Sequence, residues 1–496
     1  MKKDMKAMAC KKPVSVVMAS AMALAMTPAM AMATPTSGSD VADTQVTING
    51  LLDGDKVEAF LIADADIDAA NNLSYNFNAA VPAPYNTIDG LTAITSDGYT
   101  FTQGTDMQKA AGAIAAKIAT GANAGEDTAT TGGTATLNLG SGYYLVRVTS
   151  TSGDARVYQN MVIDVSPKAQ ADGTYASADP VEVTAKQTPV EVKKGVGANY
   201  EHKTDLYKVG DVVPFKVTTA IPNYPNDSLH ATFIIGDKPT AGLEIDTTSI
   251  QINGQAAATC ADYTLTADKT GYSIEFKQDY ILAHPGESIE VTYNAKLTSE
   301  AFSKSDTDVT GNTATVKFNP NPYDETTVTP NDKTVVQTYG YVFPKVGGTA
   351  TENQALAGAV FTLYDAEGKN VINDENGKPI TSTSKIVDGV AYVWFEDLAA
   401  GTYTAKETTV PAGYLQAPDQ KFTLSAAECT NDNPATENIV ENNYKVSTDK
   451  VVDPNKPTLP VTGGAGTFAL TATGLVLVAG ASTLIVMRKR KEREQA

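Results

Sequence analysis

Short segments in which apolar and polar residues alternate make up most of the chain between its two apolar ends. Stretches such as TATLNLGSGYYLVRVTS (134–150) and YQNMVIDVS (158–166) are rich in Thr, Val and Tyr, and turn-forming Gly, Asn and Asp separate them. This alternation favours half-buried strands. One segment, TDMQKAAGAIAAKIA (105–119), instead spaces its apolar residues as a helix does. We therefore expect an all-β fold of tandem β-sandwiches, with one helix packed against the first sheet.

Pro- and Asn-rich joints divide the 496 residues into successive units. Pro189, the NPNPYDE stretch (319–325) and the Pro330-Asn331-Asp332 step mark these joints. Polar residues 446–458 (VSTDKVVDPNKPT) are expected to form a spacer. The predicted units are a signal peptide (1–33), an N-terminal domain (34–185), a middle domain (186–335), a C-terminal domain (336–448), and a segment holding the spacer and C-terminal signal (449–496).

The N-terminus has the pattern of a secretory signal peptide. A basic region, MKKDMKAMACKK, precedes a short apolar core that ends in the small-residue step Ala31-Met32-Ala33. We expect cleavage after Ala33, which places the mature chain outside the cell.

The C-terminus carries three signals in a fixed order. Leu459-Pro460-Val461-Thr462-Gly463 is followed by an uncharged stretch, residues 467–487, and then by Arg488-Lys489-Arg490-Lys491. About 20 apolar residues can cross the hydrocarbon layer, and the basic tail stays in the cytoplasm. The arrangement resembles the cell-wall sorting signal of Gram-positive surface proteins. That resemblance implies that a sortase cleaves between Thr462 and Gly463 and joins Thr462 to an amine, so that the membrane holds the protein only before sorting.

Charge and composition exclude several classes of function. The formal net charge is −19, and both basic clusters lie in the terminal signals, so the mature chain is more acidic still. Such a surface repels phosphate backbones, which argues against nucleic-acid binding. His202, His230 and His284 are isolated, and we find no phosphate-binding loop or nucleophile motif. We expect no cofactor, no metal and no enzymatic activity toward other molecules.

The C-terminal unit carries a family resemblance. Its first strand is YGYVFPKV (339–346), and a later segment reads GTYTAKETTVPAGY (401–414). This resembles the immunoglobulin-like, collagen-adhesin B-type β-sandwich of pilins, which stack in a rod. The resemblance implies an internal isopeptide bond between Lys345 and Asn442, with Glu407 as the catalytic acid.

Strand alternation supports inward positions for these residues. Lys345 shares a face with Tyr341 and Phe343, and Glu407 shares one with Tyr403 and Ala405. Burial lowers the pKa of a lysine and raises that of a carboxylic acid. A neutral amine can then attack the side-chain amide while the protonated acid stabilises the developing oxyanion.

The middle unit shows a looser version of the same pattern. Lys194 alternates with Val192 and Val196, and the stretch ATFIIGDKPTAGLEI (231–245) resembles a strand of pilin middle domains. By this resemblance Lys194, Asp237 and Asn312 form the second triad, with Asp237 as the catalytic acid. No comparable triad stands out in the first unit.

Backbone pilins also use an exposed lysine near the end of their first domain to join subunits. Residues 159–168 (QNMVIDVSPK) keep the aliphatic spacing and the Pro-Lys step of that motif but lack its Trp and Tyr. The resemblance points to Lys168, with Lys186 as the alternative. The sequence therefore predicts a pilus backbone subunit whose partners are a sortase, identical subunits and the peptidoglycan wall. A singly anchored adhesin or minor pilin that binds a host ligand is the alternative function.

Overall fold

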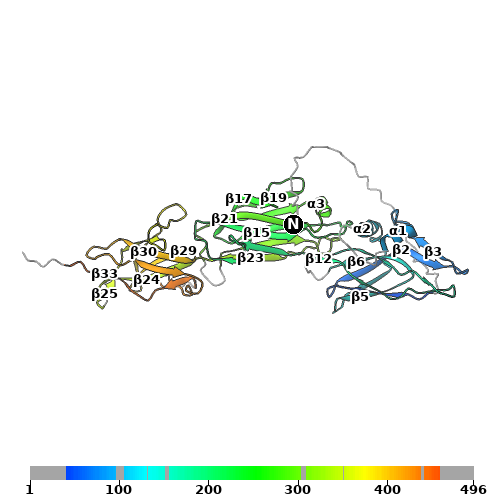
Figure 1. Ribbon diagram of the computed structural model, residues 1–496, viewed down its shortest axis with the longest axis horizontal. Helices are drawn as coiled ribbons and strands as arrows, with labels where there is room; N and C mark the ends of the chain where they lie inside the picture. The colour runs from blue at the N-terminus through cyan, green and yellow to red at the C-terminus, as the bar shows by residue number, and fades with distance from the viewer. Residues whose placement is uncertain are drawn as a thin grey trace, which may run out of the picture.

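The computed structural model describes residues 41–95, 106–130, 132–150, 156–302, 309–349, 351–436 and 441–457. Three β domains follow one another along the long axis, so the molecule is a rod (Figure 1). Each domain has its own cluster of buried apolar residues. Within the described ranges, no helix is both long and apolar enough to cross a membrane. The signal peptide, the LPVTG motif and the predicted spanning stretch lie outside them.

The N-terminal domain packs two sheets and two helices around one core. One sheet has the order β11-β1-β5, and the other has the order β3-β2-β6-β8, with β4 also paired to β2. The strands are β1 (Thr44–Asn49), β2 (Lys56–Ile67), β3 (Leu73–Phe77), β4 (Gly125–Thr128), β5 (Thr134–Leu139), β6 (Gly142–Thr149), β8 (Met161–Asp164) and β11 (Val181–Thr184). A short ribbon pairs β9 (Lys168–Ala169) with β10 (Tyr175–Ala176).

The predicted helix is confirmed as α2 (Asp106–Ile118). Ala111, Ile114 and Ile118 are buried in the core of the N-terminal domain, as their spacing predicts. A shorter helix, α1 (Ile88–Thr95), which the alternation did not reveal, lies beside α2 (Figure 1).

The middle domain is a two-sheet sandwich with the orders β13-β15-β21-β17-β18 and β14-β23-β22-β16-β20-β19. The first sheet contains β13 (Val192–Val196), β15 (Val212–Ala220), β17 (Leu243–Ile252), β18 (Gln255–Ala256) and β21 (Ser288–Leu297). The second contains β14 (Lys203–Thr204), β16 (Phe233–Pro239), β19 (Tyr263–Asp268), β20 (Gly271–Phe276), β22 (Gly311–Phe318) and β23 (Asn331–Val336). A short helix, α3 (Gln278–Ala283), follows β20. The linking strand β12 (Gln187–Pro189) pairs back to β7 (Arg156–Tyr158) of the N-terminal domain.

The C-terminal domain is a smaller sandwich built around its first strand. β24 (Tyr339–Gly348) pairs with β25 (Asn353–Ala355), β29 (Val390–Leu398), β32 (Tyr444–Val446) and β33 (Val451–Pro454), and β28 (Lys385–Val387) extends the sheet beyond β29. The opposite sheet is β27 (Thr381–Thr383), β26 (Val360–Tyr364), β30 (Gly401–Thr409) and β31 (Gln420–Leu424). The predicted domain end at residue 448 is wrong, because β33 continues this sheet as a parallel neighbour of β24.

Polar side chains join the domains end to end. Between the first two, the Gln108 amide donates to Gln159 (2.7 Å) and Asn223 (3.1 Å). Beside them, Asn160 donates to Asp227 (2.9 Å). Buried amides need such partners, so the junction fixes the two domains relative to each other. Between the second and third domains, the Tyr339 hydroxyl donates to Asp205 and the rings of Phe302 and Tyr444 meet edge to face.

Candidate functional site

The structure brings Lys194, Asp237 and Asn312 together in the core of the middle domain. Lys194 lies on β13 of one sheet, while Asp237 on β16 and Asn312 on β22 lie on the other. Their exposed fractions are 3%, 5% and 0%. Lys194 Nζ contacts Asp237 Oδ2 directly. The predicted triad therefore spans the space between the two sheets, and its assignment as an isopeptide centre stays a prediction.

A fourth residue, Tyr293 on β21, completes this group. Its hydroxyl oxygen accepts hydrogen bonds from Lys194 Nζ (2.6 Å) and Asn312 Nδ2 (2.7 Å), and the hydroxyl donates to Asp237 Oδ1 (2.9 Å). Tyr293 was not among the predicted site residues, although alternation along residues 288–297 places it on the same inward face as Val291.

The apolar surroundings move both ionisable partners toward their neutral forms. Burial lowers the pKa of Lys194, and the nearby Asp237 charge opposes that shift. Burial also raises the pKa of Asp237, against the opposing charge of Lys194. The Lys194 nitrogen lies 5.1 Å from the centre of the Phe215 ring, which excludes water on that side. A proton can therefore pass from the amine to the carboxylate at low cost.

The C-terminal domain holds a second buried lysine, Lys345, between two acids. Lys345 on β24 and Asp453 on β33 are 0% exposed, and Glu407 on β30 is 2% exposed. Lys345 Nζ contacts Asp453 Oδ1 and lies 3.9 Å from Glu407 Oε1. Glu407 Oε2 accepts the backbone N–H of Ala417 (2.8 Å). The predicted pairing of Lys345 with Glu407 is therefore present in the fold.

The predicted position of Asn442 beside Lys345 is wrong. Strand β32 is parallel to β24 and places Tyr444 opposite Gly340, five residues before Lys345. Five residues of strand span about 17 Å. Asn442 precedes Tyr444, is half-buried, and donates its backbone N–H to Asp432. The residue that meets Lys345 is Asp453, which the sequence analysis had assigned to a spacer.

Alternation could have revealed Asp453. In the segment KVVDPN (450–455), Val451 and Asp453 share a face, and both are buried. Burial raises the pKa of Glu407 to about 7; the Ala417 N–H and Lys345 oppose the rise, and Asp453 adds to it. Glu407 can therefore hold a proton beside the Lys345–Asp453 pair near neutral pH.

The N-terminal domain offers no such centre among its described residues. Its buried polar residues there include Asp55, Gln108 and Gln159 but no lysine.

The two lysines considered for linkage lie at opposite ends of the N-terminal domain. Strand β8 begins next to Asn160, which contacts the middle domain, and runs away from it to Asp164. Lys168 follows that strand, so it lies at the far end of the rod. Lys186 precedes β12 at the junction, where its carbonyl accepts the Gln159 N–H (2.9 Å).

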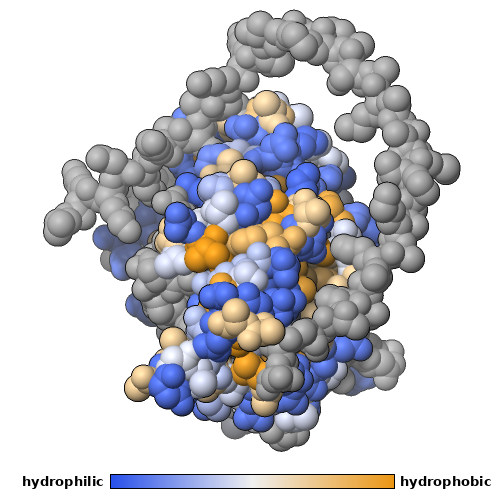
Figure 2. Space-filling view, turned by 90° about the vertical axis from the view of Figure 1, so that its right-hand side faces the viewer, coloured by the Kyte–Doolittle hydropathy of each residue, from blue (hydrophilic) through white to orange (hydrophobic). Residues whose placement is uncertain are grey.

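Lys168 is exposed as expected, but it is not unpaired. Its ammonium lies 2.5 Å from Asp179 Oδ2, and 55% of its side chain is exposed. An exposed ion pair of this kind contributes little to the stability of the fold, so the Lys168 amine separates easily from Asp179. A groove of about 490 Å³ runs beside Lys168 and includes Ser166, Pro167 and Pro180. The view onto this end of the rod shows a mostly hydrophilic surface with smaller hydrophobic areas (Figure 2).

Comparisons with known proteins bear on both the fold and the C-terminal signal. Residues 343–439 match the SpaA family, a prealbumin-like fold domain, and residues 451–494 match the LPXTG cell wall anchor motif. Fimbrial subunit type 2 of Actinomyces naeslundii is 24% identical over 396 residues, 71% of each chain. The T6 backbone pilin of Streptococcus pyogenes, described as a modular three-domain structure, covers 84% of this chain and 100% of its own at 15% identity and a TM-score of 0.59. The major pilin SpaD of Corynebacterium diphtheriae covers 83% and 98% at 18% identity and a TM-score of 0.50.

These matches support a sortase-assembled Gram-positive backbone pilin. Such a pilin is a structural protein rather than an enzyme. Its LPXTG anchor implies a sortase as partner and attachment to the cell wall outside the cell.

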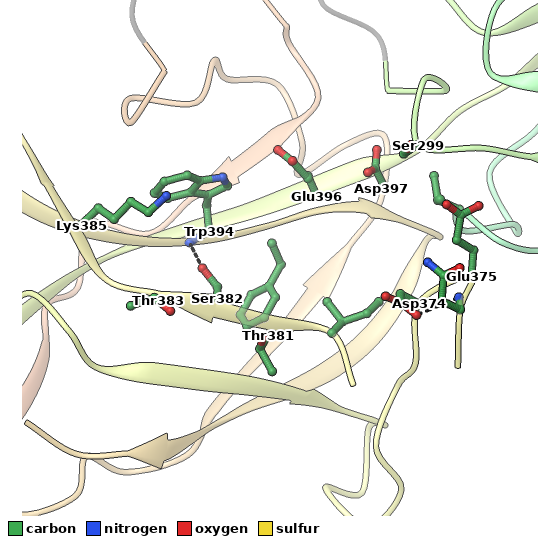
Figure 3. A pocket seen from close by; sticks show the side chains of 14 residues that line it. Ser299, Asp374, Glu375, Thr381, Ser382, Thr383, Lys385, Trp394, Glu396 and Asp397 are labelled. Atoms are coloured by element: carbon green, nitrogen blue, oxygen red, sulfur yellow. Dashed lines mark hydrogen bonds between the residues drawn. The ribbon is translucent and has the colours of Figure 1, made fainter. Parts of the chain in front are cut away.

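A separate pocket of about 480 Å³ lies between the middle and C-terminal domains (Figure 3). Asp374, Glu375, Glu396 and Asp397 make its lining acidic, and Trp394 forms part of its wall with Lys385 over the ring. Asp374 closes a polar turn by accepting the backbone N–H groups of Asn376 and Lys378.

The Asp397 carboxyl makes this junction sensitive to pH. Burial raises its pKa to about 7, and the charges of Glu396, Glu375 and Glu441 add to the rise. An acid whose pKa is higher in the folded than in the unfolded state favours folding most when protonated. Its contribution to stability is therefore lost as pH rises from about 4 to about 7.

We expect Asp397→Asn to raise the melting temperature of the C-terminal half at about pH 8 and to change it little at about pH 4. Asn is neutral and nearly isosteric, so it removes the penalty that ionisation imposes above neutral pH. Calorimetry at both pH values measures the effect. Asp388→Asn, at an exposed turn, serves as the matched control. Equal melting temperatures for wild type and Asp397→Asn at about pH 8 would contradict the pH argument.

Proposed function

We propose that this chain is the backbone subunit of a covalently polymerised surface pilus, in which sortase joins Thr462 of one subunit to a lysine of the next. The observation that carries the proposal is the pair of fully enclosed lysine–acid centres, one in each of two consecutive domains. Burying a charge lowers the stability of the folded state unless a partner offsets the loss, and a lysine enclosed beside an acid is the arrangement that isopeptide formation requires.

In the middle domain, the proposed bond joins Lys194 to Asn312. Asp237 takes a proton from the Lys194 ammonium, and the neutral amine attacks Cγ of Asn312. The new amide forms as ammonia leaves. Because Lys194 and Asn312 belong to opposite sheets, the bond would tie the two layers of the sandwich together.

In the C-terminal domain, the proposed bond joins Lys345 to Asp453. The electrophile here is a carboxyl group rather than an amide, so the leaving molecule is water. Glu407 approaches from the opposite sheet and, when protonated, can stabilise the oxygen that gains charge. The bond would join first strand β24 to its neighbour β33, the last strand of the domain.

These crosslinks suit a shaft that must bear tension. Each would close a loop of about a hundred residues, which by the disulfide analogy stabilises the folded state by about 4–5 kcal/mol. Cys429 is a buried free thiol, so no disulfide joins it to Cys260. The isopeptide bonds would crosslink the middle and C-terminal domains covalently.

We expect the intact mass of recombinant residues 34–457 to fall short of the sequence mass by one ammonia and one water. Asp237→Ala should abolish the ammonia loss, and Glu407→Ala should abolish the water loss. Asp453→Asn should replace the water loss with a second ammonia loss, because the electrophile becomes an amide. High-resolution mass spectrometry distinguishes the two leaving molecules.

Asn442→Ala is the matched control for the C-terminal centre, and it should leave the mass deficit unchanged. A deficit that disappears with Asn442→Ala and survives Asp453→Ala would restore the original assignment. A wild-type chain of full sequence mass would exclude both internal bonds.

The proposed link between subunits uses Lys168. Its position at the far end of the N-terminal domain puts the nucleophile opposite the C-terminal signal that carries Thr462, as head-to-tail growth requires. Lys186 is exposed as well, but it lies beside the junction with the middle domain and not at the far end of the rod.

We expect Lys168→Arg to abolish the high-molecular-weight ladder of cell-wall extracts boiled in SDS. Arginine keeps the charge that faces Asp179, but its guanidinium does not accept an acyl group as an amine does. Lys186→Arg is the matched control and should polymerise normally. A ladder that survives Lys168→Arg and disappears with Lys186→Arg would move the linkage to Lys186. A wild-type protein that runs as a single band would favour the singly anchored adhesin with a host ligand.

A further inference from the structure

We propose that the Tyr293 hydroxyl transfers a proton from the attacking nitrogen of Lys194 to the leaving nitrogen of Asn312. This inference rests on the proposed Lys194–Asn312 bond and adds a catalytic residue to it.

The phenol oxygen of Tyr293 lies between the two nitrogen atoms that exchange protons in the proposed reaction. It lies 2.6 Å from Lys194 Nζ and 2.7 Å from Asn312 Nδ2, so one atom contacts both the nucleophile and the leaving group. The hydroxyl proton points to Asp237 Oδ1 at 2.9 Å. All four side chains are 5% exposed or less, so bulk water has little access to supply or remove protons.

The proton inventory of the reaction is a further argument. After Asp237 has taken one proton, the neutral amine of Lys194 attacks Cγ of Asn312, and the carbonyl electron pair moves to Oδ1. The attacking nitrogen must then lose a proton, while Nδ2 must gain one to leave as ammonia. Tyr293 accepts the first proton and donates its own to Nδ2. The carbonyl re-forms as the bond to Nδ2 breaks, and the phenol ends as it began.

The C-terminal centre supports this assignment by contrast. Among the described residues there, the side chains of Lys345 and Glu407 contact the Asp453 carboxyl and two backbone groups, and neither makes a hydrogen bond to a hydroxyl. Its electrophile, Asp453, releases water. Because hydroxide is a far weaker base than amide anion, its departure depends less on a donated proton. The hydroxyl therefore occurs at the centre whose leaving group needs it.

The packing of the Tyr293 ring allows its hydroxyl to be removed without loss of the ring contacts. Its ring stacks on Phe215 at 5.4 Å and meets Tyr272 edge-on at 5.2 Å. Phenylalanine keeps both contacts and removes the hydroxyl. Tyr272 is a matched control, because it is 5% exposed and its hydroxyl has no hydrogen-bond partner among the described residues.

The experiment follows ammonia loss in the recombinant chain by intact mass over time. We expect Tyr293→Phe to fold but to form the middle-domain bond roughly a hundredfold more slowly than wild type, as loss of a proton-transfer group usually does. Tyr272→Phe should be fully bonded on purification. Complete ammonia loss from freshly purified Tyr293→Phe would overturn the proposal.

A second variant separates proton transfer from mere positioning. In Tyr293→Phe with Asn312→Asp, the leaving group becomes water, and we expect bond formation to recover relative to Tyr293→Phe alone. If both variants fold, shown by circular dichroism, and neither forms the bond, Tyr293 only positions Lys194 and Asp237 and the transfer step is wrong. Absence of ammonia loss from wild type would instead refute the proposed bond itself, independently of Tyr293.

Discussion

The contact between a buried lysine and a buried carboxyl is the interaction on which the interiors of the middle and C-terminal sandwiches depend. An ion isolated in an apolar core costs several kcal/mol, so Lys194 and Lys345 are tolerable only if an acid on another strand meets each of them. Asp237 and Asp453 do so in the two domains. This requirement constrains how the strands that carry these residues can pack, because a shift of one residue along a strand would turn the lysine toward solvent.

The same contact explains why the centres can react without an external catalyst. Burial weakens the charged form of both partners, which makes a neutral amine and a neutral acid accessible in one place. Folding itself brings the electrophile within reach, so assembly of the core and activation of the nucleophile are one event. Exposed Lys168 has no such environment, and its reaction therefore requires an enzyme that brings an activated Thr462 to it.

The sequence predicted correctly those features that depend only on the alternation of apolar and polar residues, such as which side chains point into the core. Period-two spacing correctly turned Lys194 and Glu407 inward, and period 3.6 identified α2. Alternation could not place Asn442, because it predicts which face of the sheet a residue lies on but not which residue it meets on the neighbouring strand. The register of β32 and β33, which both run parallel to β24, determines those neighbours. Asp453 was missed because a charged, Pro-flanked segment is typical of a linker, and only its pairing partner makes it a strand. Tyr293 looks like an ordinary core residue until the hydroxyl is seen between two nitrogens.

The two centres differ in the side chain that supplies a proton to the leaving group. In the middle domain, the electrophile is an amide whose leaving nitrogen is strongly basic, and the fold places a hydroxyl between both nitrogens. In the C-terminal domain, the electrophile is a carboxyl, and a second acid beside it is sufficient to supply the proton. The choice of Asn or Asp at the electrophile therefore determines which additional side chain each core must contain. A core designed around Lys and Asp can consist of aromatic and aliphatic residues plus one acid, whereas a core designed around Lys and Asn also needs a buried group that can give and accept a proton.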